Sequence, residues 1–360
     1  MTIELTIIVP SYNRPDRLHR ALSYWCQSDW EVIVADGSEL SNEVIAGEFK
    51  VSKYLWDNKS SLVDRWISAI NQVESEFLLI CADDDFVGFD ACEKCVSYLK
   101  SYPTASSAQG LYLGFDNSFK CPLFYPYYNF YRKPFFDPLS KSYPLFEYNQ
   151  SAISERIFNG FRYYHTLMYS VQRTSNVKKG LINFPKLTND NPFEIQFNFL
   201  NLMFGKSVIL PIFYGVRESI IGSAGSSNAC VTDWIENDPV SFNEWRNFCV
   251  AKFVGNLGLS HEGGQDLFEI ALLGYKQFVE ELCQVDTGGI TGLNKILSIP
   301  KNLLKSCLPG KLIAKIREKN VKKRTGMEPD LVQLARNLYG EDSVPDAMRI
   351  QQAILGSDII

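Results

Sequence analysis

The chain has 360 residues, enough for one large domain with a smaller appendage or for two modest domains. Hydrophobic residues make up 46% and charged residues 21%, as in ordinary soluble proteins, and the net charge of -5 argues against a general nucleic-acid binder. No signal-peptide core and no apolar run approaching the roughly 18 residues of a membrane span is visible. Nine cysteines without a regular framework indicate reduced thiols, so we expect a cytoplasmic protein.

Apolar runs of strand length alternate with helical patterns over the first hundred residues. Strands are predicted at residues 5–9, 31–35 and 77–82, and helices near residues 15–25, 63–70 and 90–99. Asp90 is expected to cap the third helix. Such alternation predicts a mostly parallel sheet covered by helices on both faces, which is an α/β, Rossmann-like arrangement.

The pattern changes from about residue 111. Phe, Tyr and Pro crowd residues 123–148, and the later elements are predicted as a helix at 150–159, a strand at 164–171, a helix from Asn191–Pro192 and a strand at 208–213. A glycine- and serine-rich link at 221–227 precedes a remainder with helical patterns. We therefore expect a first region at residues 1–224 and a mainly helical C-terminal region at residues 225–360.

Three adjacent acids, Asp83, Asp84 and Asp85, follow the third predicted strand. Adjacent carboxylates repel one another, so the arrangement is costly unless a cation joins them or water solvates them as an acidic turn. Mg²⁺ and similar ions take oxygen ligands and keep positions for phosphate oxygens. Ligands of parallel sheets bind beyond the carboxyl ends of the strands. The position of the triplet after a buried strand therefore favours a metal-assisted diphosphate site over a solvated turn.

Four motifs, in this order, resemble those of glycosyltransferase family 2: Ile7–Arg14, Val32–Ser38, Asn58–Asn71 and Ala82–Phe86. The last resembles the DxD motif in the variant of the bacterial "glycosyltransferase domain" subfamily. Two positions depart from the family: Ala35 stands where the family often has an aspartate, and Ser60 stands at the usual glycine. The motifs cover about residues 1–115, and a looser likeness extends to about residue 220.

The resemblance implies a GT-A fold, a nucleotide-sugar donor with UDP-sugars favoured, and Mn²⁺ or Mg²⁺ as the metal. Pro10, Ser11 and Tyr12 are then expected to line the nucleoside pocket, with Arg14 beside them in the same motif and Asp36 accepting from the base. Asp83 and Asp85 would form the metal-binding pair, with Asp85 the direct ligand and Asp84 at the donor. Asp84–Asp85 is the alternative register.

Two arginines lie where they can reach a donor phosphate. Arg65 is one helical turn past Ser60–Ser61, and a solvated helix charge explains it equally well. Arg217 follows the strand at 208–213 and could close over the diphosphate, although surface ion pairing is an equal explanation.

An inverting enzyme of this family needs a carboxylate base at a loop–helix junction after a mid-domain strand. The matching stretch is 187–194, and Asp190 is favoured as the base. Glu194 is the alternative, but we expect Asn191 as N-cap, Pro192 at N1 and Glu194 at N3 to form a capping box. Asp190 would then precede the cap and point into the cleft.

Three further features have weaker functional interpretations. His165 could face the acceptor or a phosphate, although a satisfied strand histidine is the simpler interpretation. Cys92 and Cys95 form a CxxC without a second pair and are expected in the core. The aromatic segment 123–148 could stack on acceptor sugars or pack against its own domain.

Residues 293–324 carry many Lys and Arg interleaved with Leu and Ile, and Glu318 is the only acid. Basic amphipathic helices of this kind lie on anionic membrane surfaces, although a solvated helical face has the same composition. We expect peripheral contact with the inner face of the cytoplasmic membrane, as suits a glycan or lipid-linked acceptor in surface polysaccharide synthesis.

The favoured function is an inverting, metal-dependent sugar transferase. A sugar nucleotidyltransferase or a Rossmann cofactor enzyme needs a glycine-rich loop after the first strand, and Ser11–Pro15 has no glycine. A non-catalytic glycan-binding protein or inactive homologue is the alternative, for which Ala35 is a mild argument.

Overall fold

The structure is a computed structural model and describes residues 4–117, 122–126, 150–188, 190–218, 231–294 and 329–356. The strands are β1 (Leu5–Ser11), β2 (Glu31–Asp36), β3 (Lys53–Trp56), β4 (Phe77–Ile80), β5 (Asp85–Val87), β6 (Ala105–Asp116), β7 (Leu123–Pro126), β8 (Val171–Arg173) and β9 (Lys206–Glu218). The helices are α1 (Pro15–Trp25), α2 (Glu43–Gly47), α3 (Leu62–Asn71), α4 (Phe89–Ser101), α5 (Ile153–Arg162), α6 (Thr174–Leu181), α7 (Asn191–Phe204), α9 (Val231–Asn237), α10 (Pro239–Leu257), α11 (His261–Asn294), α14 (Leu331–Tyr339) and α15 (Val344–Leu355).

One mixed sheet organises the molecule, in the strand order β3-β2-β1-β4-β8-β6-β9-β5, with β7 paired to β6. The first four strands are parallel, as the alternating pattern predicts. Beyond β4 the sheet is different: β8 runs antiparallel to β4 and β6, and β5 runs antiparallel to β9. The α/β class with a GT-A-like sheet is therefore confirmed, while its second half is mixed.

The first strand and helix show why the local sequence specifies this arrangement. Every residue of β1 is buried, so its apolar run reads as a strand covered on both faces. Pro15 stands in the first turn of α1, where its missing N–H costs nothing, and Leu18, Leu22 and Trp25 face the core at helical spacing.

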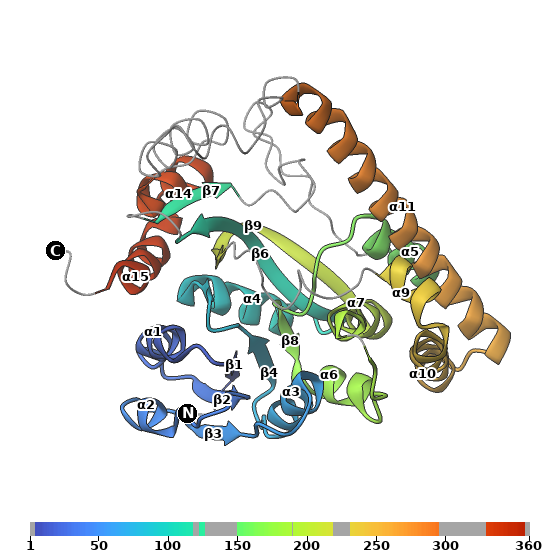
Figure 1. The fold of residues 1–360 in the computed structure, drawn as a ribbon, viewed down its shortest axis with the longest axis horizontal. Helices are drawn as coiled ribbons and strands as arrows, with labels where there is room; N and C mark the ends of the chain where they lie inside the picture. Colours follow the sequence, from blue (N-terminus) through green and yellow to red (C-terminus); the bar gives the residue numbers. More distant parts are fainter. Residues whose placement is uncertain are drawn as a thin grey trace, which may run out of the picture.

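The helices fall into two groups that contact different partners. In the first, α15 contacts both α1 and α4, and in the second, α3 contacts α6 and α6 contacts α7. A separate apolar cluster joins α5, α7, α10 and α11 (Figure 1). Helix α7 is apolar on both sides, with Phe193, Phe197 and Leu200 in the sheet core and Ile195, Phe199 and Leu202 in the helical cluster.

The described parts of the C-terminal region are helical, as predicted, but they lie in two places. Helices α9 to α11 build the helical cluster. Helices α14 and α15 return to the sheet, where they contact β9, and lie on the opposite side of the molecule from α10 (Figure 1). Leu331, Leu334 and Ile350 belong to the sheet core. The division at residue 225 stays a prediction, and the last two helices pack with the first region.

Two local predictions are wrong. Gly88, not Asp90, is the N-cap of α4, and the carboxylate of Asp346 on α15 accepts from the first free N–H groups. The strand predicted at 164–171 is absent apart from the start of β8. The Asn198 side chain bonds the backbone of His165 and Leu167 instead, which satisfies these groups without a strand partner.

Several predicted features fall outside the described residues: most of the aromatic segment 123–148, the link at 221–227 and the basic stretch from residue 295 to 324. Within the parts of the chain that the structure describes, no helix is both long and apolar enough to span a membrane. Cys92 and Cys95 are fully buried on α4, which confirms their place in the core.

Candidate active site

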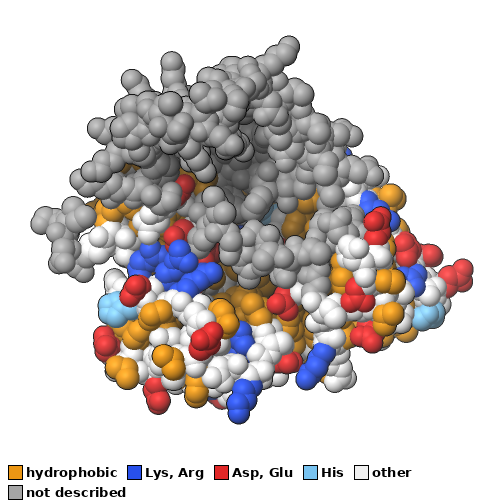
Figure 2. Space-filling view, in the orientation of Figure 1, with side chains coloured by type: hydrophobic (Ala, Val, Ile, Leu, Met, Phe, Trp, Pro, Cys, Tyr) orange, Lys and Arg blue, Asp and Glu red, His pale blue; other side chains and the backbone are white. Residues whose placement is uncertain are grey.

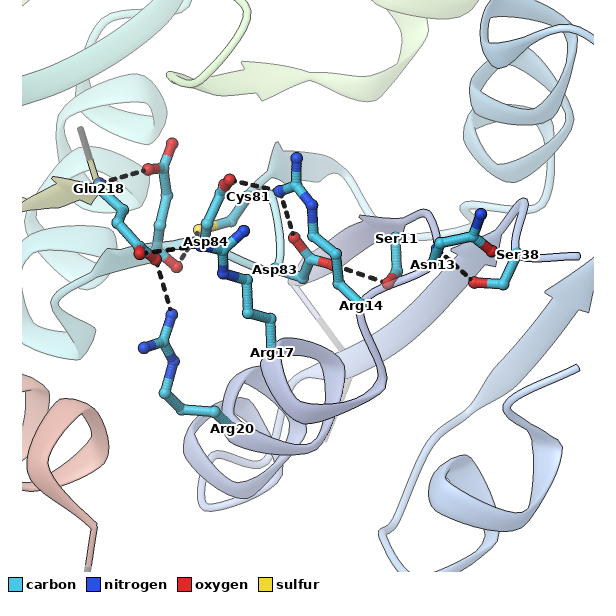
Figure 3. A network of polar contacts seen from close by, with 11 residues as sticks. Ser11, Asn13, Arg14, Arg17, Arg20, Ser38, Cys81, Asp83, Asp84 and Glu218 are labelled. Carbon is cyan, nitrogen blue, oxygen red and sulfur yellow. Dashed lines mark hydrogen bonds and ion pairs between the residues drawn. The ribbon is translucent and has the colours of Figure 1, made fainter. Parts of the chain in front are cut away.

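Polar side chains meet where the parallel strands end. Because β1 pairs with both β2 and β4, the residues that follow these strands lie side by side. Ser11, the last residue of β1, is opposite Asp36, the last residue of β2. Its hydroxyl donates to Asp83 Oδ2 at 2.7 Å, which ties the end of β1 to the acidic triplet after β4 (Figure 3). Pro10 precedes Ser11 in the buried strand and pairs with Ala35.

Arg14 lies against the first two acids of the triplet. It is the N-cap residue of α1, and its Nη1 is 3.3 Å from Asp83 Oδ1 and 2.6 Å from Asp84 Oδ2. One guanidinium thus bridges two neighbouring carboxylates and offsets part of their repulsion.

Asp85 is held by different partners on β9. Asp85 pairs with Arg217 in the strand register, Arg217 Nε donates to Asp85 Oδ2 at 3.0 Å, and the Glu218 amide donates to Oδ1. The Arg217 guanidinium also lies 4.2 Å from the centre of the Tyr169 ring. Arg217 therefore lies beside the triplet and is paired with one of its carboxylates, and its contact with a donor diphosphate stays a prediction.

Two arginines that the sequence reasoning missed complete this network. Arg17 and Arg20 of α1 each donate to one oxygen of Glu218 at 3.0 Å, and Figure 3 shows both pointing from α1 toward it. Basic side chains gather on this face of the molecule near α1 (Figure 2). The spacing of three residues between Arg14, Arg17 and Arg20 was the available signal. Arg17 and Arg20 therefore hold Glu218, whose amide donates to Asp85 of the triplet.

Burial and charge at the triplet indicate whether a divalent cation can bind there. Asp83 and Asp85 are buried, and burial, reinforced by the charge of Asp84, raises the pKa of Asp83 to about 6. Burial also raises the pKa of Asp85, against the opposing charge of Arg217. Ionising both carboxylates in this buried place therefore costs free energy, despite their arginine partners. A divalent ion would lower this cost, and hard carboxylate oxygens are suitable ligands.

The described residues contain no set of three His, Cys, Asp or Glu side chains arranged as a ready-made metal site. Mg²⁺ in nucleotide enzymes is commonly held by one or two carboxylates together with substrate phosphates. Asp83 and Asp85 fit that second arrangement, in which the donor completes the ligand set.

A second part of the site surrounds an exposed aromatic ring. The Tyr12 side chain follows β1 and is 53% exposed, and the Arg65 guanidinium lies 5.9 Å from its ring centre. Arg65 also passes over Gly37, where any Cβ would collide with the guanidinium. Glycine at position 37 therefore lets Arg65 reach the strand ends, beside a flat ring on which a base can stack.

Asp36 stabilises the backbone in this part of the site. Its carboxylate is fully buried and accepts from the Ser38 amide, from Tyr54 Oη at 2.6 Å and from Asn42. Burial alone would raise the pKa of Asp36, but the bonds from Ser38, Tyr54 and Asn42 outweigh it and lower the pKa. Asp36 thus anchors the loop from Asp36 to Asn42, and its contact with a base stays a prediction.

Asp190 is the N-cap residue of α7, directly before the helix begins at Asn191, and makes no side-chain cap bond. The predicted capping box is therefore wrong: Glu194 accepts instead from Tyr164 Oη at 2.9 Å. Burial raises the pKa of Asp190, and the charge of Arg65 opposes it. A polar cavity of about 320 Å³ borders Asp190, lined also by Ser60, Ser61 and Lys186.

His165 is buried in the loop before β8, and burial, followed by the charge of Arg217, lowers its pKa to about 3. The ring is therefore neutral at pH 7, and the prediction that it meets the acceptor stays untested.

Comparisons with known proteins agree with the fold. Residues 6–163 match the sequence model of glycosyl transferase family 2. S. aureus TarS 1-349 in complex with UDP-GlcNAc superposes with a TM-score of 0.52 and 15% identity, covering 98% of this chain and 90% of that chain. A second structure of S. aureus TarS 1-349 gives a TM-score of 0.51 with the same identity and coverage.

A longer S. aureus TarS chain matches 76% of this chain with a TM-score of 0.48 and 15% identity, and this protein spans only 44% of that chain. No curated protein matches the chain. At these identities the structures establish the fold alone.

The mixed sheet gives the chain a GT-A-like fold, and with the family 2 match of residues 6–163 it places the chain among the glycosyltransferases. More specifically, residues 6–163 are similar to glycosyl transferase family 2, and α14 and α15 pack against β9 of the same sheet.

Proposed function

We propose that the protein transfers a sugar, with inversion, from a nucleotide-sugar donor to a hydroxyl of a glycan or lipid-linked acceptor. UDP-sugars are the first candidates for the donor. One observation carries the proposal: the exposed Tyr12 ring, Arg65 and the acidic triplet surround one set of strand ends, and Asp190 lies within electrostatic reach of Arg65. Side chains suited to bind a nucleoside and a diphosphate thus lie together, with a candidate catalytic base nearby.

The reaction requires three things of these residues. Tyr12 stacks on the base, and Arg65 and Arg14 attract the phosphates. Asp83 and Asp85 would hold Mn²⁺ or Mg²⁺, which would supply positive charge for the departing diphosphate. Asp190 takes the proton of the acceptor hydroxyl as its oxygen bonds to the anomeric carbon and the bond to the diphosphate breaks. The raised pKa of Asp190 brings it nearer the working pH of a base.

Calorimetric titration with UDP tests the donor site. We expect micromolar binding with Mn²⁺, and its loss with EDTA or in Asp85→Ala. Asp29→Ala is the matched control, because Asp29 is an exposed acid outside the site. Binding of GDP, CMP or dTDP in place of UDP would keep the fold assignment and change the donor. If no nucleotide binds under any condition, a glycan-binding or inactive homologue becomes the better account.

The acceptor belongs to the same proposal. Residues 293–324, which lie almost entirely outside the described residues, would hold the enzyme at an anionic membrane surface where lipid-linked glycans are made. Flotation of the full chain with vesicles that contain phosphatidylglycerol, and not with neutral vesicles, is the expected result. Equal behaviour with both would exclude electrostatic membrane contact.

A further inference from the structure

Helix α15 approaches the acidic triplet from the far end of the sequence. It contacts α1, α4 and β9, and its Asp346 side chain is buried against the start of α4. Nothing in the local sequence of α4 requires this partner, since Asp90 stands in the first turn as a ready carboxylate. Asp90 is instead paired with Arg349 of α15 at 3.4 Å.

Asp346 caps α4 from 256 residues away. Its two oxygens accept from the Asp90 amide at 3.2 Å and the Ala91 amide at 3.1 Å. These N–H groups have no partner within their own 13-residue helix, and they lie at the end where the helix dipole favours negative charge. Arg349 lies 3.3 Å from Asp346 Oδ1 and packs over the Phe89 ring. The carboxylate is therefore bonded on both of its oxygens.

Gly88 makes room for this carboxylate. A Cβ at position 88 would collide with the Asp346 side chain, although the backbone of Gly88 is in an ordinary extended conformation. The absence of a side chain is thus required by close approach and not by backbone strain.

The capped end of α4 is joined to the triplet by a short and rigid path. β5 begins at Asp85, contains three residues and leads directly into Gly88. The Val87 carbonyl accepts from Tyr24 Oη at 2.8 Å, and the Gly88 amide donates to the Tyr214 carbonyl at 2.8 Å. We therefore expect a displacement of α4 at its first turn to act on Asp85, because no loop separates them.

We propose that Asp346 is a positioning residue for the Asp83–Asp85 triplet, so that the C-terminal helix α15 completes the donor site of the first domain. Its effect on donor binding rests on the proposed function. Its effect on the backbone of β5 does not, so each can be tested by itself.

The experiment compares Asp346→Ala with Asp330→Ala. Asp330 caps the neighbouring helix α14 through the Gln333 amide, so its removal deletes a similar cap on a helix that packs against β9 and β7. UDP is titrated with Mn²⁺ and with EDTA at a temperature where circular dichroism shows each protein folded. Amide hydrogen exchange of the ligand-free proteins is followed at Asp85 and Gly88.

For Asp346→Ala we expect the Mn²⁺-dependent gain in UDP affinity to fall about tenfold, affinity in EDTA to stay unchanged, and exchange at Asp85 and Gly88 to accelerate. Asp330→Ala should change neither. Asp346→Asn keeps an oxygen for the amides and should recover most of the gain. Gly88→Ala should reproduce Asp346→Ala, and the two changes together should be less than additive, because they break the same contact.

The outcomes separate the two claims. If Asp346→Ala and Gly88→Ala leave both the Mn²⁺-dependent gain and the exchange at Asp85 unchanged, Asp346 only stabilises the fold and the inference fails. If the wild type shows no Mn²⁺-dependent gain while exchange at Asp85 still rises in the variants, the metal-dependent function fails and the positioning role stands. Should Asp346→Ala not fold, Asp346→Asn and Gly88→Ala decide by the same two measurements.

Discussion

The sheet region and the helical cluster of this molecule use buried space in opposite ways. At the carboxyl ends of β1, β2 and β4, buried carboxylates and arginines are packed into one network. The cluster of α5, α7, α10 and α11 instead buries aromatic rings, with Phe199 in contact with Phe161 and Phe268. Burying charged groups in the first region costs folding free energy, whereas apolar burial in the second region stabilises the fold.

Helix α7 connects the two regions. Its rings pack into both cores, and its first turn follows Asp190, the candidate base. A helix with apolar side chains in two separate cores is held by packing on both sides. The comparison suggests that the helical cluster holds α7 in place while the strand ends carry the chemistry, and the following substitutions test that division.

The largest effect is expected for Asp190→Asn. The amide keeps the shape of the side chain but cannot accept the acceptor proton, so turnover of the matching sugar donor should fall by roughly 10²- to 10⁴-fold. UDP affinity should stay within about twofold, because Arg65 and the triplet are intact. Initial rates and calorimetry on the same preparation measure the two quantities.

Glu194→Gln is the control for this assignment. Glu194 accepts from Tyr164 Oη, and a glutamine oxygen can still accept that bond. Its turnover should therefore remain near wild type. A large loss in Glu194→Gln together with normal rates in Asp190→Asn would exchange the roles of the two residues.

Phe199→Ala tests the other region. Phe199 is buried on the helical side of α7, with its ring 4.5 Å from that of Phe161 and 5.7 Å from those of Trp245 and Phe268. Its truncation should cost about 3–5 kcal/mol of stability, by lost burial and the cavity left behind. Denaturant unfolding measures this loss. UDP affinity of the folded variant should be unchanged, and a tenfold drop would show that the helical cluster shapes the donor site directly.

The local sequence predicted the helices and buried strands of the first region well. Leu18, Leu22 and Trp25 recur at helical spacing, and the apolar runs of β1 and β4 are buried as read. The triplet was found because three acids after a buried strand are unusual in any context. These features depend on residues close together in the chain, so periodicity and motif spacing reveal them.

Features that depend on distant partners could not be predicted. Asp85 and Arg217 are 132 residues apart, and no local sequence pattern predicts that β5 pairs with β9. Asp90 was expected to cap α4 because a local rule favours an acid there, whereas Asp346 supplies the cap from another helix. The capping box failed in the same way, because Tyr164 takes Glu194 as its partner. Tertiary contacts replaced the local choice each time.

A smaller, pH-dependent effect is expected at His165. Burial and Arg217 lower its pKa to about 3, whereas the unfolded chain binds a proton near pH 6.5. Between these values the unfolded state binds more protons, so stability falls as pH drops below 6.5. The contribution lost between pH 7 and pH 5 should be about 2 kcal/mol.

His165→Gln removes this contribution, and its unfolding free energy should fall less steeply between pH 7 and pH 5 than that of the wild type. Asp83, whose pKa is raised to about 6, acts with the opposite sign because the folded state then binds the extra proton. Asp83 is present in both proteins and cancels in the difference. Identical slopes would mean that folding does not lower the pKa of His165.

The smallest effect is expected for Tyr54→Phe, which removes the hydroxyl that donates to Asp36 and accepts from the Asn42 amide. Because this pair is partly exposed, the loss should be about 1 kcal/mol in denaturant unfolding. The Asp36 pKa is lowered in the folded state, so the difference from wild type should be present above about pH 4 and shrink below it.

The same variant separates two roles for Asp36. If Asp36 only anchors the loop from Asp36 to Asn42, UDP affinity should fall together with the stability of that loop, and Asn42→Ala should lower it as well, since Asn42 also donates to Asp36. If Asp36 binds the base directly, removing its competitor Tyr54 should raise UDP affinity, because the carboxylate gains an oxygen free to accept from the base. The sign of the change in affinity therefore decides between an anchor and a ligand.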